Sequence, residues 1–250
     1  MLYRLKRHPF AVKAHFDFSL VLTYAFPKEI LTPLLPPGIE LDNFGDYGFV
    51  AVAMVQTNKL RPFFVPAFMG KNFFLSGYRI FVKYHTLKGK RYRGLFILRS
   101  DTDNSTMQTF GNLLTHYNYH TIKVSISKSP NGVDIKTVTP QGESDAEIKV
   151  NYGVENIQLP NGSVFKDWKE ARRYAGPMPF TFDYEKQTHS IIFIEGVREN
   201  WEPKPVFVEE ENVEFLKQPM FKSARPILSN AFIVENIPYM WRRGVREKLP

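Results

Sequence analysis

Basic side chains are concentrated in a stretch of the chain that has no carboxylate to neutralise them. Residues 47–100 contain no Asp or Glu but ten lysines and arginines, among them Arg79, Lys83, Arg93 and Arg99. Such cations bind carboxylates through charge-assisted hydrogen bonds. The bias fits a pocket for a small anion, ordinary surface basicity, or a surface for nucleic acid or anionic lipid. Because no helix-turn-helix, zinc-finger or RNP-like pattern accompanies the charge, nucleic acid is not the expected partner.

The histidines and carboxylates give weaker signals. His116 and His120 are spaced i, i+4 but lack the HExxH context of a zinc site, and the chain has no cysteine. Asp101 and Asp103 are expected to cap a helix, with an acid–base carboxylate pair as the alternative. The sequence also has no P-loop, dinucleotide fingerprint or GxSxG elbow. We therefore expect no metal and no cofactor.

Many of the cations lie on a predicted β-hairpin. Residues 73–86 and 91–100 are rich in aromatic and β-branched side chains and flank Lys88 and Gly89. With a two-residue turn, one face holds two sets of four side chains: Tyr78, Ile80, Val82 and Tyr84, with Arg93, Leu95, Ile97 and Arg99. A turn one residue longer regroups the two sets. Both faces carry apolar groups, which predicts strands of a curved sheet or barrel, buried outside and lining a space inside.

Helix signals follow the hairpin. Residues 103–105 are good cap residues, and Met107, Phe110, Leu114 and Tyr117 recur at helical spacing. A second helix is expected over residues 164–174, capped by residues 161–163. The Pro- and Phe-rich loop 59–70 is expected to pack its aromatic side chains, with a lid or a partner surface as the alternatives.

The overall composition is that of a folded protein. The chain has 250 residues, of which 43% are hydrophobic, and a net charge of +8. No repeat or linker divides it, so we expect a single domain over residues 1–250. No stretch approaches the ~18 apolar residues of a membrane span, and residues 16–26 predict a first strand instead of a signal peptide. The absence of cysteine favours a cytoplasmic location.

Several segments resemble one known superfamily. Residues 24–42 read YAFPKEILTPLLPPGIELD and precede the strand GFVAVAMV, and RGLFILRSD precedes a helix and the exit NYHTIKV. SVFKDWKEARRYAG and IEGVRENWEPKPV come further on. Over roughly residues 16–210 this pattern resembles the acetoacetate decarboxylase-like superfamily, most closely its uncharacterised bacterial YqjF-like branch. The resemblance implies an α+β, β-rich fold, a cone-shaped antiparallel β-barrel with a few short helices and a largely apolar cavity.

Three departures from the decarboxylase pattern argue against Schiff-base chemistry. The decarboxylases carry a Lys-Lys pair late in the helix after the hairpin, where one lysine forms a Schiff base with a β-keto acid. The matching residues 113–116 hold no lysine. Tyr24 is followed by Ala25, where the decarboxylases have an arginine. The acidic pocket residues of the family have no counterpart within residues 47–100.

We therefore expect a small-molecule-binding protein for a small organic acid or apolar ligand. The expected ligand contacts are Tyr24, Arg79, Lys83, Arg93 and Arg99. The alternative is a lysine-independent lyase or hydrolase acting on a carboxylated small molecule. Its proton-transfer candidates are His116, Tyr119 and His120. A basic surface module for nucleic acid or anionic lipid is the weaker alternative, and a homo-oligomer remains open.

Overall fold

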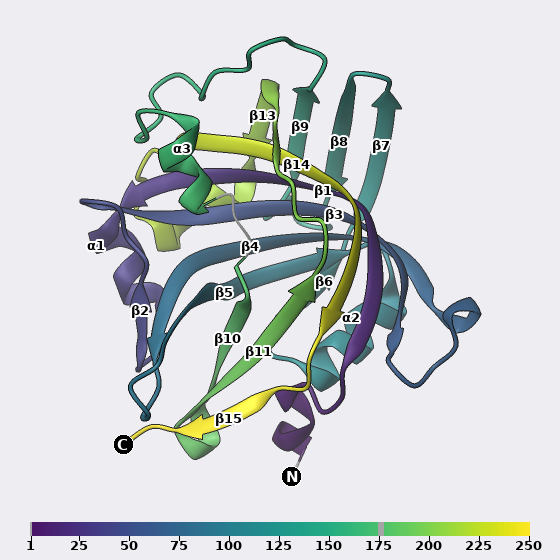
Figure 1. The fold of residues 1–250 in the computed structure, drawn as a ribbon, viewed down its shortest axis with the longest axis vertical. Coiled ribbons are helices and arrows are strands. Elements are labelled where there is room, and N and C mark those ends of the chain that lie inside the picture. Colours follow the sequence, from purple (N-terminus) through teal and green to yellow (C-terminus); the bar gives the residue numbers. More distant parts are fainter. Residues whose placement is uncertain (1, 175–177) are drawn as a thin grey trace.

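The computed structural model describes residues 2–174 and 178–250 and is dominated by one large, curled β-sheet (Figure 1). Nine strands follow one another in the order β12-β14-β1-β3-β4-β5-β10-β11-β15, while β2 pairs with β4 and β6 with β5. The bounds of these strands are β1 Val12–Pro27, β2 Ile39–Leu41, β3 Tyr47–Pro62, β4 Lys71–His85, β5 Arg91–Thr102, β6 Tyr119–Thr121, β10 Phe180–Glu185, β11 Ser190–Arg198, β12 Lys204–Pro205, β14 Ile227–Trp241 and β15 Val245–Lys248.

The large sheet closes on itself. β11 pairs with β14, with Gly196 opposite Trp241, so the path through β14, β1, β3, β4, β5, β10 and β11 returns to its start. Neighbouring strands are antiparallel except that β10 and β6 run parallel to β5. The result is a barrel with few short helices, which is the β-rich fold that the sequence predicts.

A second sheet covers part of the barrel's outer face. It has the order β13-β9-β8-β7 and stands at the top of Figure 1. Its strands are β7 Lys123–Ser129, β8 Gly132–Val138, β9 Ala146–Asn151 and β13 Phe207–Val213. Ile135 and Ile148 of this sheet share one apolar core with barrel residues such as Val52 and Ile80. This part of the barrel is therefore covered by protein on the outside.

The barrel strands alternate between two cores, as side chains along a strand must. On β3, Val50, Val52 and Met54 belong to the outer core. The intervening Ala51 and Ala53 belong to the inner core. The hairpin strand β4 alternates in the same way, with Ile80 and Val82 in the outer core and Phe81 in the inner core, which confirms that this strand is buried outside and faces a space inside.

The predicted side-chain grouping of the hairpin is wrong, because its turn is one residue longer than two. The backbone N–H of Thr86 donates to the carbonyl of Lys90 at 2.9 Å, which leaves a three-residue loop. Tyr84 therefore faces Tyr92, and Lys83 faces Arg93. The result is that Arg93, Leu95 and Ile97 share a face with Arg79, Phe81 and Lys83, as the longer-turn alternative requires. A bulge after Tyr78 returns Arg99 to the face of Tyr78.

The helices are short and partly differ from expectation. They are α1 Lys28–Leu31, α2 Ser105–Leu114 and α3 Trp168–Ala171, with 3-10 turns η1 Leu2–Arg7, η2 Thr32–Leu34, η3 Ala67–Met69, η4 Arg172–Tyr174, η5 Lys186–Thr188, η6 Glu214–Lys217 and η7 Pro219–Phe221. The cap of α2 is Asn104, whose Oδ1 accepts the Met107 N–H at 2.9 Å, which confirms a cap within residues 103–105. The capping role expected of Asp101 and Asp103 is wrong. α3 starts three residues after Phe165 and is capped by Asp167, so the predicted helix over 164–174 is too long.

The aromatic side chains of the loop between β3 and β4 are exposed, contrary to the packing expectation. β3 continues to Pro62, and the loop projects from the right-hand side of the barrel in Figure 1. Phe64 is 64% exposed and Phe68 87%. Among the described residues, no helix is long and apolar enough to cross a membrane.

Candidate functional site

The inner face of the barrel encloses a cavity of about 100 Å³. Most of its walls are apolar or small, and no Lys, Asp or Glu is among the described residues that line it. The lining side chains come from β1, β3, β4, β5, β6, β10, β11 and β14 and from nearby loops. Those used below are Leu75, Arg79, Tyr117, Tyr119, Arg198, Trp201, Tyr239 and Trp241.

Arg79 is the central charged group of the cavity. It extends from the middle of β4, and its Nε is buried without a hydrogen-bond partner among the described residues. Burial lowers the pKa of the guanidinium, while Tyr239, Tyr119 and Tyr117 act in the opposite direction. No described carboxylate neutralises this cation, so the cavity carries a positive charge. An anionic ligand bound there would neutralise it.

Small residues make room for Arg79. A Cβ atom on Gly77 would lie 2.8 Å from Arg79 Nε and 2.9 Å from Nη2. On β3, Ala53 is opposite Gly77 and Ala51 is opposite Arg79. Larger side chains at these positions would fill the space around the guanidinium, so the glycine and alanines define where the cation lies.

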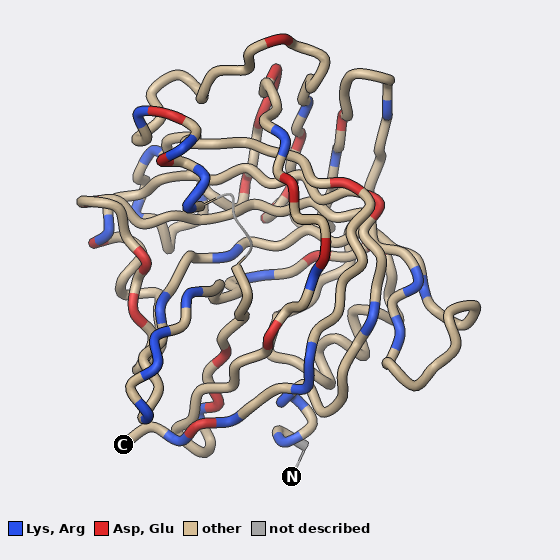
Figure 2. The backbone as a smooth tube through the Cα atoms, viewed as in Figure 1, with Lys and Arg blue, Asp and Glu red and all other residues tan. Residues whose placement is uncertain are grey.

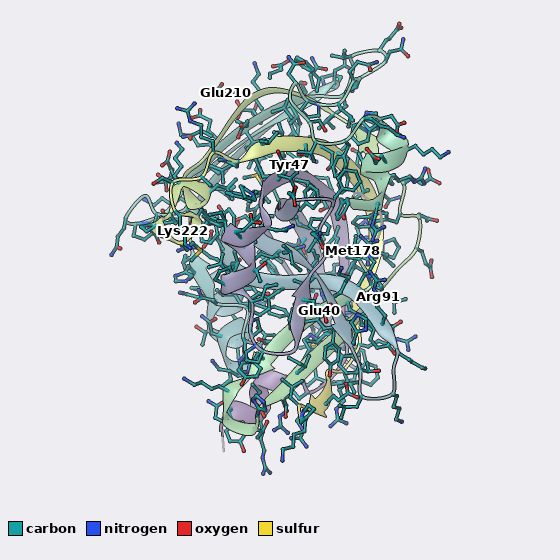
Figure 3. The ribbon with its side chains drawn as sticks, turned by 90° about the vertical axis from the view of Figure 1, so that its left-hand side faces the viewer. Glu40, Tyr47, Arg91, Met178, Glu210 and Lys222 are labelled. Atoms are coloured by element: carbon teal, nitrogen blue, oxygen red, sulfur yellow. The ribbon has the colours of Figure 1, made fainter. Side chains whose placement is uncertain are left out.

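Arg198 is a second cation at the cavity, and it is held by the protein. Its Nη1 donates to Tyr239 Oη at 3.4 Å, and its Nη2 donates to the carbonyl of Met178, a residue labelled in Figure 3. The guanidinium carbon also lies 4.9 Å from the ring centroid of Trp201. Stacking and hydrogen bonding fix this guanidinium, unlike that of Arg79.

Tyr117 and Tyr119 add two phenol groups to the cavity. Burial raises the pKa of Tyr119 to about 12, and it raises that of Tyr117 further above its usual value. Both phenols therefore stay protonated near neutral pH and can donate hydrogen bonds. The ring of Tyr119 lies against α2 at Gly111, where a Cβ would approach it to 2.4 Å. Gly111 weakens the helix but allows this close packing.

Of the five expected ligand contacts, only Arg79 is among the described residues that line the cavity. Tyr24 is in the outer core, and its hydroxyl donates to Glu211 Oε2 at 2.6 Å. Arg93 donates to Asp42 Oδ2 at 2.6 Å, and Lys83 Nζ is 3.9 Å from the same carboxylate.

Arg99 is held by two carboxylates. Its Nε donates to Asp101 Oδ1 at 2.7 Å, and its Nη2 to Glu143 Oε1 at 2.9 Å. Asp101 is completely buried and also accepts a hydrogen bond from Ser144 Oγ at 2.9 Å. The charge of Arg99 is therefore balanced within the protein.

The three proton-transfer candidates are separated. Tyr119 lines the cavity, whereas His116 and His120 are not among the described lining residues. His116 Nδ1 lies 4.0 Å from Asp183 Oδ2, and burial lowers the pKa of His116 to about 4. His120 Nε2 is 3.1 Å from Asn118 Oδ1. Because α2 ends at Leu114, the i, i+4 spacing of the histidines does not place them on one helix.

The sequence did not indicate four of the residues at this site, which are Gly77, Tyr117, Arg198 and Tyr239. A sequence pattern that could have indicated the two cavity arginines is Gly-x-Arg within a strand. It occurs from Gly77 to Arg79 on β4 and from Gly196 to Arg198 on β11. Gly196 also makes space, because its Cβ would lie 2.1 Å from Tyr239 Oη. Among the described residues, no cluster of three or more His, Asp or Glu could hold a metal ion.

The comparisons with known proteins agree with this fold. The structure of acetoacetate decarboxylase from Legionella pneumophila matches with a TM-score of 0.63 at 12% identity, covering 96% of this chain and 88% of that one. An acetoacetate decarboxylase-like enzyme from Sphingomonas wittichii RW1 matches with a TM-score of 0.58 at 11% identity, covering 98% and 94%. The enduracididine biosynthesis enzyme MppR complexed with pyruvate gives 0.60 at 10% identity, covering 95% and 90%.

Sequence comparison identifies the family. A search of curated protein sequences gave no match. Residues 13–233 match the family described as uncharacterized conserved protein DUF2071 (COG2071). This match spans most of the chain, including the strands that build the cavity. The chain therefore belongs to the DUF2071 family of uncharacterized conserved proteins and has the fold of the acetoacetate decarboxylase-like superfamily.

Proposed function

We propose that this protein binds a small organic carboxylate in the barrel cavity and holds it through Arg79. The observation that carries the proposal is the buried Arg79 Nε, which has no hydrogen-bond partner among the described residues. A buried N–H group without an acceptor is unfavourable, and an anion that enters the cavity and accepts from Nε removes this penalty. A carboxylate suits the position because its two oxygens accept parallel N–H bonds from one guanidinium.

The rest of the cavity fits the same class of ligand. Tyr117 and Tyr119 supply phenolic donors, and Arg198 adds positive charge beside Arg79. The apolar walls suit the carbon skeleton of an organic acid, and a volume of about 100 Å³ limits the size of the enclosed part. MppR, which has a similar fold, forms a complex with pyruvate, a small carboxylate.

Binding without a Schiff base is part of the proposal. No lysine is among the described residues lining the cavity. Lys83 is the one lysine among the ligand contacts expected from the sequence, and its Nζ lies 3.9 Å from the Asp42 carboxylate. The proposal therefore relies on hydrogen bonds and charge, with no covalent bond to the ligand.

A lysine-independent lyase or hydrolase is the second candidate, and the position of Tyr119 favours it. Tyr119 lines the cavity, and its pKa of about 12 keeps its proton available near neutral pH. The phenol can therefore donate a hydrogen bond that stabilises negative charge developing on a ligand whose carboxylate is bound by Arg79.

The charge distribution gives less support to a basic surface module. In Figure 2, Lys and Arg are spread over several elements with Asp and Glu between them. Arg99 is buried between Asp101 and Glu143, so it contributes little to a surface stripe. We also propose that residues 1–250 form one domain, since β14, near the end of the chain, pairs with β1.

Calorimetric titration with pyruvate and with its uncharged amide tests the proposal. We expect pyruvate to bind with a Kd of about 1 mM or below, and the amide at least tenfold more weakly. Equal affinities, or no binding of pyruvate, acetate or benzoate, would exclude the carboxylate site. Borohydride treatment with acetoacetate, followed by intact-mass measurement, is expected to give no adduct. A covalent adduct would overturn the non-covalent part of the proposal.

A further inference from the structure

An apolar groove of about 500 Å³ lies beside the cavity, between α2, the loop that joins β3 to β4, and residues 8–12. Its lining includes exposed apolar side chains: Phe110 is 55% exposed, Leu113 39% and Met69 57%. Ligand-binding sites are commonly concave and lined mainly by apolar side chains. The groove is therefore suited to an apolar ligand group.

The groove borders the cavity, and strand β4 contributes side chains to both. On β4, Phe73 and Leu75 line the groove, while Leu75 and Arg79 line the cavity. These residues are on one face, because their positions differ by even numbers. Leu75, Tyr117, Tyr119 and Trp241 line both spaces, so the two hollows share one wall made of these residues.

A second neighbouring space has a different chemistry. A cleft of about 690 Å³ shares Arg198 and Tyr239 with the cavity, but its other walls include the charged Lys13, Asp17 and Lys59. A hydrocarbon chain would have to displace water from these charges, whereas the groove offers it apolar partners. The groove is therefore the favourable path for an apolar extension of a ligand bound at Arg79.

We propose that the natural ligand is an amphipathic carboxylic acid, with its carboxylate at Arg79 and its hydrocarbon chain in this groove. The inference rests on the proposed carboxylate site and adds the class of ligand. The chain passes between the shared side chains Leu75, Tyr119 and Trp241 and lies against Met107 and Phe110 of α2. A carboxylate of two or three carbons occupies the cavity alone, and each longer chain covers more of the groove.

Titration with straight-chain carboxylates from acetate to decanoate, below their micelle concentrations, tests this assignment. Transfer of a methylene group from water to an apolar site strengthens binding about fourfold. We expect Kd to fall by about this factor per carbon once the chain reaches the groove. Octyltrimethylammonium, which has the chain but the opposite charge, should bind at least tenfold more weakly than nonanoate.

Paired variants locate the chain. Phe110→Gln combined with Leu113→Gln should flatten the dependence of Kd on chain length. The matched control, Phe207→Gln with Met220→Gln, changes exposed apolar residues outside the groove and should keep that dependence. Arg61→Gln with Lys71→Gln removes cations at the groove and tests the reverse orientation, in which the carboxylate lies outside. We expect this pair to retain nonanoate binding.

The outcomes separate this inference from the proposed function. Acetate and pyruvate binding with no gain from longer chains would overturn the amphipathic ligand and leave the carboxylate site intact. Loss of nonanoate binding in the Arg61 and Lys71 pair would overturn the orientation. A chain-length gain that persists in the Phe110 and Leu113 pair would overturn the groove assignment. No binding of any carboxylate would reject both proposals.

Discussion

Replacing Arg79 by methionine should stabilise the ligand-free protein while abolishing carboxylate binding. The Nε of Arg79 is buried without a partner, and burial lowers the pKa of its guanidinium. Replacing this partly buried and uncompensated cation by an apolar side chain is worth about 1 kcal/mol. In a chain of this length, each kcal/mol raises Tm by about 2–4 °C.

The expected loss of affinity follows from the same contact. A bidentate guanidinium–carboxylate pair contains two charge-assisted hydrogen bonds, each worth about 1.5–3 kcal/mol. Losing both should weaken pyruvate binding about 100-fold or more. The variant therefore combines higher stability with lower affinity, which is the signature of a residue placed for ligand binding at the expense of folding free energy.

Arg99→Met is the matched control, since Arg99 is on the neighbouring strand β5 and is fully paired. Its removal leaves the buried Asp101 carboxylate without its partner at 2.7 Å, which should cost about 3 kcal/mol or more. Urea denaturation of the three proteins at pH 7 compares their free energies of unfolding, and calorimetry measures pyruvate affinity. If Arg79→Met proves less stable than the parent by about 2 kcal/mol, as a structural arginine would be, the reasoning fails.

Three further substitutions test the surroundings of the site. Gly77→Ala places a Cβ 2.8 Å from Arg79 Nε and should weaken pyruvate binding about tenfold in calorimetry; an unchanged Kd would contradict this. Asp42→Asn leaves Arg93 without its carboxylate partner at 2.6 Å. Urea denaturation should show a free energy of unfolding lower by about 3 kcal/mol, and a loss under about 1 kcal/mol would show that this ion pair contributes little to stability. Burial raises the pKa of Asp183 from 3.8 to about 7. Between these values the folded chain keeps a proton that the unfolded chain releases. The contribution of this carboxyl group to stability therefore falls as pH rises from about 4 to 7. Asp183→Asn should therefore gain stability relative to the parent across that range, and a difference independent of pH would refute the shift.

More of the fold than of the candidate site could be predicted from the sequence. Alternating apolar residues on both faces of the hairpin indicated doubly buried strands, and the structure confirms them. The register could not be predicted, because a turn of two or three residues decides which side chains share a face. The closure of the barrel through β11 and β14 joins segments about 40 residues apart, for which the sequence carries no local signal.

The fold pairs part of the cation-rich stretch with carboxylates that lie outside it in the sequence. Residues 47–100 contain no carboxylate, but Asp42 and Asp101 lie just beyond its two ends. Asp42 pairs with Arg93 across β4 and β5, and Asp101 pairs with Arg99 two residues before it. Counting charges along the chain therefore overestimated the cations available to a ligand. Arg79 has no such carboxylate among the described residues.

The glycine two residues before each cavity arginine makes room for a polar group at the cavity. Residues i and i−2 are on the same face of a strand, so a glycine at i−2 leaves a gap beside the arginine stem. Gly77 provides this gap for Arg79, and Gly196 provides it for the Tyr239 hydroxyl that accepts from Arg198. The other two Gly-x-Arg triplets begin at Gly89, in the hairpin turn, and at Gly244, between strands. In this chain, both Gly-x-Arg triplets that lie wholly within a strand place their arginine at the cavity, whereas only one of the ten cations in residues 47–100 is among the described residues that line it.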